Sequence, residues 1–118
     1  MSAGFTYGML VSGDLGYTCL KAVCEWFTPV FVLTDRNSYT IAAFCKEKNI
    51  PFFQGNPRQG KGFSFIAGLK VDILLSVNYL FLIEKDILSV PTRYAINFHG
   101  SLLPKYRGRT PHVWAIIN

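Results

Sequence analysis

Charged residues are scarce in this 118-residue chain. Asp, Glu, Lys and Arg make up 16% of the sequence, against about a quarter in an average globular domain. Half of the residues are hydrophobic and 15% are aromatic, which is enough to build one core. A single small domain exposes much of its surface, and that surface normally carries many charges. The low share of charged residues therefore predicts that something else covers part of the apolar surface. We expect a further C-terminal segment, a second domain or a partner subunit in that role.

The sequence also lacks the segments that direct a chain to membranes or stabilise it by disulfides. Its first five residues carry no basic stretch before an apolar run, unlike a secretion signal. The apolar runs have the length of a strand, and none reaches the roughly 18–20 residues needed to cross a bilayer. Cysteines 19, 24 and 45 are odd in number and without Cys-x-x-Cys spacing, which argues against a disulfide framework or a structural zinc site. We therefore expect no metal, buried free thiols and a cytoplasmic location.

Strand and helix signals alternate along the chain. This alternation predicts an α/β fold, a three-layer sandwich in which helices cover both faces of a mostly parallel sheet. We treat the chain as one domain. Strands are predicted at 6–12, 30–33, 51–53, 71–77 and 94–98, and helices at 15–27, from caps at 35–38 to about 48, at 63–69, at 83–88 and from 113 onward.

Ligands of such sheets bind outside the carboxyl ends of the strands. That rule indicates three places here: the turn at Gly13, the segment after Val77 and the segment after Phe98. At the first place, Val11 stands where a dinucleotide-binding fingerprint needs its first glycine. We interpret residues 12–16 as a tight turn between strand and helix, with a closely packed glycine.

At the third place, Asn97 and His99 follow each other with one residue between them. Alternation along a strand puts both side chains on one side and Phe98 on the other. An amide donor and an imidazole that titrates near neutrality could stabilise an oxyanion and move a proton during acyl transfer. The pair could equally be buried and bonded to backbone groups, and position alone does not separate these two interpretations.

The run from Asn97 to Pro104, NFHGSLLP, resembles the Asn-x-His-x-Ser-Leu-Leu-Pro signature of the 10-formyltetrahydrofolate-dependent formyltransferases. Residues 13–20 and 72–79 resemble the first turn and the central strand of that family more weakly. The resemblance implies a Rossmann-like formyltransferase fold, 10-formyltetrahydrofolate as formyl donor and catalysis by Asn97 and His99. It also implies a folate pocket lined by Tyr79, Phe81, Leu82 and Ile83, although these residues could be ordinary core.

The segment that follows, 105–111, resembles the nucleotide-sugar N-formyltransferases most, and Arg109 is the discriminating residue. The resemblance implies an anionic nucleotide sugar as the small-molecule substrate, and the net charge of +5 suits such a partner. No motif for DNA binding is visible. Three alternatives remain. They are methionyl-tRNA formyltransferase, which would bind tRNA, a formyltetrahydrofolate hydrolase, and a non-catalytic module that binds folate or a nucleotide. A homodimer is compatible with each of them. The residues expected to contact the substrate are Ser101, Lys105, Arg107 and Arg109.

The family's active site has a third member, an aspartate downstream of the histidine. No Asp or Glu follows His99 in this sequence. We therefore expect the chain to be the N-terminal part of a catalytic domain, truncated at the C-terminus and inactive alone.

Overall fold

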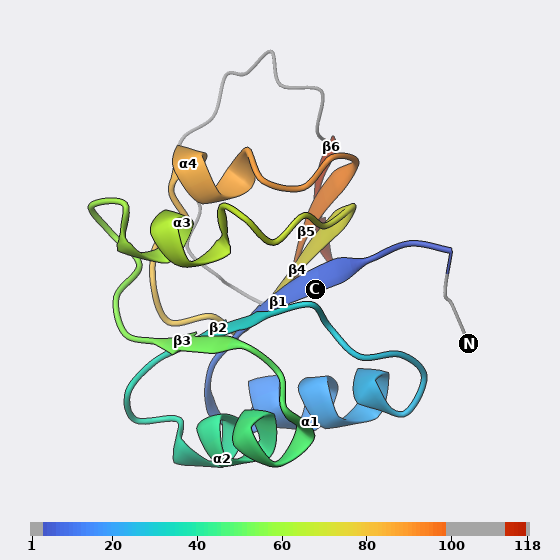
Figure 1. Ribbon diagram of the computed structural model, residues 1–118, viewed down its shortest axis with the longest axis vertical. Helices are drawn as coiled ribbons and strands as arrows, with labels where there is room; N and C mark the ends of the chain where they lie inside the picture. The colour runs from blue at the N-terminus through green and yellow to red at the C-terminus, as the bar shows by residue number, and fades with distance from the viewer. Residues whose placement is uncertain (1–3, 99–112, 118) are drawn as a thin grey trace.

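The computed structural model in Figure 1 is a twisted parallel sheet with helices on both faces. It describes residues 4–98 and 113–117. Within these residues the sheet has six strands in the order β3-β2-β1-β4-β5-β6, and every neighbouring pair is parallel. The predicted α/β fold is thereby confirmed. The strands are β1 (Tyr7–Val11), β2 (Val32–Thr34), β3 (Phe52–Gln54), β4 (Ile73–Val77), β5 (Tyr94–Phe98) and β6 (Val113–Ile117).

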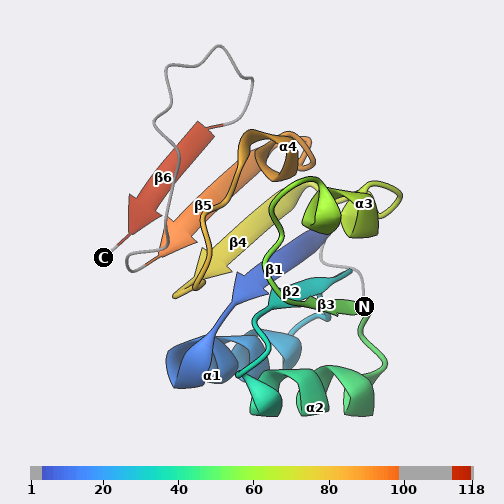
Figure 2. The ribbon, with the colours of Figure 1, turned by 90° about the vertical axis from the view of Figure 1, so that its left-hand side faces the viewer.

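The helices lie in two layers. Figure 2 shows α1 (Gly13–Cys24) and α2 (Tyr39–Lys48) on one face of the sheet, and α3 (Lys61–Ile66) and α4 (Lys85–Leu88) on the other. The chain runs outward from β1 to β2 and β3, then returns and runs outward from β4 to β5 and β6. The connections from β1 to β2 and from β2 to β3 cross the sheet in one direction, and those from β3 to β4 and from β4 to β5 cross it in the other. Because such crossovers are right-handed, opposite directions place the helices on opposite faces. The order of the strands therefore reverses between β1 and β4.

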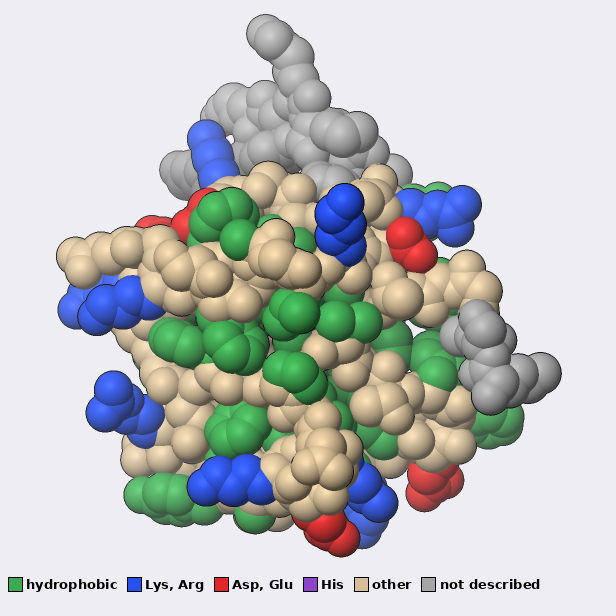
Figure 3. All heavy atoms as spheres, viewed as in Figure 1, with side chains coloured by type: hydrophobic (Ala, Val, Ile, Leu, Met, Phe, Trp, Pro, Cys, Tyr) green, Lys and Arg blue, Asp and Glu red, His purple; other side chains and the backbone are tan. Residues whose placement is uncertain are grey.

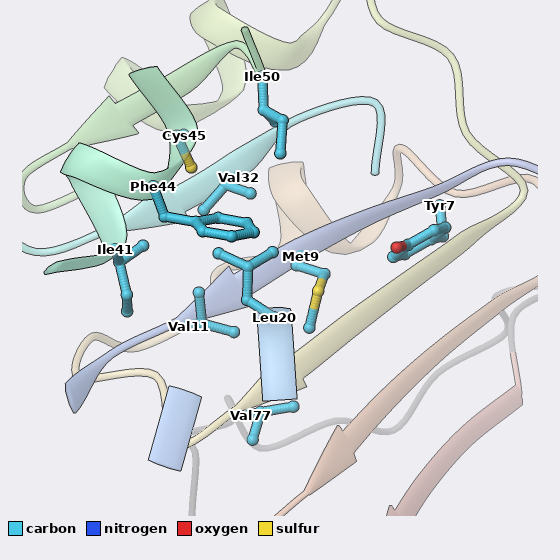
Figure 4. Close-up of a cluster of buried hydrophobic side chains, with 10 residues drawn as sticks. All are labelled: Tyr7, Met9, Val11, Leu20, Val32, Ile41, Phe44, Cys45, Ile50 and Val77. Atoms are coloured by element: carbon cyan, nitrogen blue, oxygen red, sulfur yellow. The ribbon is translucent and has the colours of Figure 1, made fainter. Parts of the chain in front are cut away.

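Alternation along β1 divides the core between the two faces. Tyr7, Met9 and Val11 face α1 and α2, where Figure 4 shows them packed with side chains from those helices and from β2 and β4. Leu10 points the other way, into the cluster beneath α3 and α4. A strand at the centre of a parallel sheet is covered on both faces, which is why all five residues of β1 are buried.

Two expectations differ from the structure. Residues 113–117 form strand β6 rather than the start of a helix, because the β-branched residues of this short segment pair in register with β5. The helix after β1 begins directly at Gly13, so the predicted turn is its first turn. Strand β4 lies inside the sheet, yet Ile73 and Leu75 are only half-buried because α1 and α2 lie mainly over β1, β2 and β3.

Large hydrophobic side chains reach the surface. The clearest are Trp26 and Tyr39, which are 81% and 72% exposed. Figure 3 shows hydrophobic side chains in a band across the middle of one face, with Lys and Arg side chains around its edge. Among the helices of the described residues, none has both the length and the apolar character of a membrane span.

Candidate functional site

An open cleft of about 520 Å³ lies at the carboxyl ends of β1, β2 and β4. This is the edge of the sheet, beside the point where the strand order reverses, at which ligands of α/β proteins bind. Each of the three strands contributes the turn that follows it. The lining residues are Ser12 and Gly13 after β1, Asp35, Asn37 and Ser38 after β2, and Asn78, Tyr79 and Leu80 after β4.

The turn after β1 is tight because two glycines allow it. Gly13 has a φ of 69°, a backbone conformation in which a side chain is strained. A Cβ on Gly16 would lie 3.0 Å from the Cβ of Val11 and 3.2 Å from its carbonyl carbon, so α1 approaches the end of β1 closely. This confirms the closely packed glycine that the sequence predicted.

Asp35 is the charged group among the described residues that line the cleft. Its side chain is 5% exposed and accepts hydrogen bonds from the Ser38 hydroxyl at 2.6 Å and from the Asn37 amide at 3.0 Å. Burial acts to raise the pKa of Asp35, but hydrogen bonds from Ser38, Ser12 and the Asn37 backbone outweigh it and lower that pKa below its usual value. Asp35 is therefore ionised at neutral pH.

The turn after β4 is bonded to the strands on both sides of it. Asn78 adopts a φ of 55°, its side chain donates to the Ser12 carbonyl at 3.2 Å, and its amide donates to the Phe98 carbonyl at 3.4 Å. The Leu80 amide donates to the Ser12 hydroxyl at 3.0 Å. These bonds hold the start of the predicted folate-binding segment between the ends of β1 and β5.

The four predicted folate-binding residues divide between the core and the surface. Tyr79 and Ile83 are buried in the cluster under α3 and α4, and Tyr79 also lines the cleft. Phe81 is partly buried, and its ring stands edge-on to Tyr79 with 5.7 Å between centroids. Leu82 is 42% exposed. Burial raises the pKa of the Tyr79 phenol, and the neighbouring Asp35 carboxylate raises it further, so this hydroxyl is neutral at physiological pH.

Asn97 is buried at the carboxyl end of β5, with 1% of its surface exposed. Phe98 packs against the cluster on the α1 side, so strand alternation puts Asn97 on the opposite side, with Ala95 of the α3–α4 cluster. Its register partner on β4 is Ser76, which is equally buried. The two polar side chains therefore lie side by side near the ends of adjacent strands.

Sequence reasoning did not select Asp35 or Ser76 as site residues. A polar residue within the apolar run 71–77 is a signal that could have indicated Ser76. Five predicted site residues lie outside the described residues: His99, Ser101, Lys105, Arg107 and Arg109. Within the described part of the chain, no group of three His, Cys, Asp or Glu side chains could hold a metal ion.

The described groups around the cleft are hydrogen-bond donors and acceptors with little intrinsic reactivity. They comprise amides, hydroxyls and one carboxylate that is already engaged by its neighbours. Such an arrangement can bind and orient a polar ligand and can stabilise a developing negative charge.

Two comparisons with known proteins bear on this site. Residues 30–118 match the protein family described as formyl transferase. A stretch of 73 residues is 41% identical to the bifunctional polymyxin resistance protein ArnA of Wigglesworthia glossinidia brevipalpis. That stretch is 62% of this chain and 11% of the relative, so the chain spans only a small part of the length of the curated relative it matches.

Proposed function

The chain belongs to the formyl transferase family, and on that premise we propose that the protein transfers a formyl group from 10-formyltetrahydrofolate to an amine of a nucleotide-linked amino sugar. The observation that carries the proposal is the buried Asn97 at the carboxyl end of β5, beside β4 and close to the hydrogen-bonded turn that follows β4. The family match includes this residue and the whole NFHGSLLP run.

The segment after β4 suits a flat, partly apolar ring such as a pterin. Leu80 and Leu82 are 55% and 42% exposed, and Phe81 packs on Tyr79 beside them. Ligand pockets combine apolar walls of this kind with a few polar groups that fix orientation. When bound, 10-formyltetrahydrofolate supplies an activated formyl group. In our proposal Tyr79, Phe81, Leu82 and Ile83 hold its pterin ring.

Asn97 and His99 act on the formyl carbon in this scheme. The Asn97 amide donates a hydrogen bond to the formyl oxygen, which gains negative charge as the substrate amine attacks. His99 stabilises the same charge and relays a proton from the attacking nitrogen. Removing one preorganised donor of this type costs roughly a hundred- to a thousandfold in turnover.

The acceptor is assigned from the residues after the catalytic pair. Lys105, Arg107 and Arg109 form a basic segment, and guanidinium groups bind diphosphates with two parallel hydrogen bonds. In our proposal this segment and Ser101 bind the anionic half of a nucleotide sugar. The excess of basic over acidic residues, 12 against 7, suits an anionic substrate.

The test is formyl transfer by the purified full-length protein, of which we propose these 118 residues to be a part, with 10-formyltetrahydrofolate and a panel of nucleotide-linked amino sugars. Mass spectrometry follows the formylated product, and absorbance follows the released tetrahydrofolate. We expect Asn97→Ala and His99→Ala to lower turnover about a hundredfold or more. Asn56→Ala is the matched control, because this exposed asparagine lies on the loop after β3.

Two results would contradict the proposal. Near-normal turnover in either variant would remove the catalytic assignment. Release of formate without a formylated amine would identify a hydrolase instead. Because Asn97 is buried, Asn97→Asp, which nearly keeps its size, is tested beside the alanine variant, and circular dichroism confirms that each variant folds.

A further inference from the structure

We propose that Asp35 is a positioning residue, which holds the turns after β1, β2 and β4 in one arrangement through the hydroxyls of Ser12 and Ser38. The proposal builds on the proposed function, since it assigns Asp35 a role in folate binding that acts through the two serines. It rests on the bonds that converge on this one carboxylate.

Two serine hydroxyls lie between the Asp35 carboxylate and a backbone amide of another turn. The Ser38 hydroxyl donates to Asp35 Oδ1 at 2.6 Å and accepts from the Gly13 amide at 3.0 Å. The Ser12 hydroxyl accepts from the Leu80 amide at 3.0 Å, and it lies close enough to the Asp35 carboxylate to help lower its pKa. A hydroxyl has one hydrogen and two lone pairs, so donation to the carboxylate fixes its direction and turns its lone pairs toward the backbone amide.

The arrangement requires a carboxylate at position 35. Ser12, Ser38 and the Asn37 amide all approach it as donors, and a carboxylate offers about four acceptor positions and no hydrogen. An asparagine of the same size would present an NH₂ group to at least one of these donors. Hydrogen bonds to a charged acceptor are also stronger than those to a neutral one.

The two arms of this network hold different parts of the cleft. The arm through Ser12 ends at Leu80, inside the segment that contains Tyr79 and Phe81. The arm through Ser38 ends at Gly13, the first residue of α1. Loss of the first arm frees the turn after β4, and loss of the second frees the start of α1. The arms can therefore be separated by mutation.

Residue-resolved amide exchange, followed by NMR, tests the network without reference to activity. We expect Ser12→Ala to accelerate exchange of the Leu80 amide about tenfold, as the loss of one hydrogen bond predicts, and to leave the Gly13 amide unchanged. Ser38→Ala should do the reverse, and Asp35→Asn should accelerate both. Unchanged exchange at Leu80 in both Ser12→Ala and Asp35→Asn would overturn the proposal.

Kinetics then test whether the network serves folate binding. We expect Asp35→Asn and Ser12→Ala to raise the KM for 10-formyltetrahydrofolate about tenfold, with a smaller change in kcat. Ser38→Ala should leave this KM within about twofold, and Ser12→Thr, which keeps the hydroxyl, should restore it. A purely structural role would lower thermal stability without this split between KM and kcat.

The outcomes distinguish this proposal from the proposed function. If the unmutated full-length protein transfers no formyl group, the proposed function fails, and amide exchange still decides whether Asp35 holds the turns. If transfer occurs and the folate KM is the same in all variants, the positioning role fails while the proposed function stands. If Asp35→Asn does not fold, the two serine variants carry both tests.

Discussion

Substitution of Gly16 by alanine sets two effects of known size against each other. Gly16 lies in the first turns of α1, where its backbone crosses the end of β1. An added Cβ would lie 3.0 Å from Val11 Cβ, 3.2 Å from its carbonyl carbon and 3.4 Å from its Cα. Real Cβ atoms rarely approach other carbons this closely, so either α1 or the end of β1 has to move.

The balance favours destabilisation. Alanine is about 1 kcal/mol better than glycine inside a helix, whereas an extra methyl group in a well-packed interior costs typically about 1–3 kcal/mol. Two of the three crowded atoms are backbone atoms of Val11, which is fully buried and pairs with Val77 on β4. Since this strand cannot give way easily, we expect a net loss of about 1 kcal/mol for Gly16→Ala.

Gly68→Ala is the matched control. Gly68 follows α3, and a Cβ at this position would meet no atom within 4 Å. Here only the lower entropy of the unfolded chain acts, which stabilises by about 0.4–1 kcal/mol. Urea unfolding followed by circular dichroism measures both variants. Equal or greater stability of Gly16→Ala than of the unmutated protein would refute the close-packing argument.

Two further predictions concern ionisable groups. Burial, with a smaller effect of the Cys24 thiol, raises the pKa of Cys45 to about 12. At pH 8 we therefore expect iodoacetamide to modify the half-buried Cys19 at least about a hundredfold faster than the buried Cys45. This difference in rate should disappear when urea unfolds the protein. The lowered pKa of Asp35 stabilises the fold at pH values above the unfolded-state pKa of about 3.9, and this contribution is lost as the pH falls through the folded-state value. Urea unfolding measures the difference in the free energy of unfolding between the unmutated protein and Asp35→Asn. This difference should therefore be largest at pH 7 and should decrease below about pH 4. A constant difference across this range would contradict an ionised Asp35.

The order of elements could be predicted from sequence because each signal is local. The run 71–77 is apolar enough to be a strand, and the apolar residues of 15–27 recur at helical spacing. The strand order could not be predicted, because it depends on pairing between distant segments such as β1 and β4. The segment 113–117 was assigned wrongly for the same reason, since its pairing with β5 decides its conformation.

In the candidate site, too, only the features with a local sequence signal could be predicted. Asn97 could be proposed from the sequence because strand alternation and a motif act over a few residues, and its catalytic role stays a prediction, since its burial at the end of β5 fits a structural role equally well. Asp35 was interpreted only as part of a helix cap. The contacts around it join three separate turns, since Ser12 lies near Asp35 and accepts from the Leu80 amide, and nothing in the spacing of these residues along the chain predicts this arrangement.

Both N-cap serines deviate from the local rule in a way that explains this failure. Ser12 and Ser38 precede α1 and α2, yet neither side chain caps its own helix. The Ser38 hydroxyl accepts from Gly13, the first amide of the other helix, and the Ser12 hydroxyl accepts from Leu80. An N-cap bond contributes about 1 kcal/mol to its own helix, and here both hydroxyls bond across the cleft instead. Departures of this kind are expected where a protein gives up local stability to fix a functional site. Alanine at either serine should therefore disturb the cleft more than the helix that it precedes.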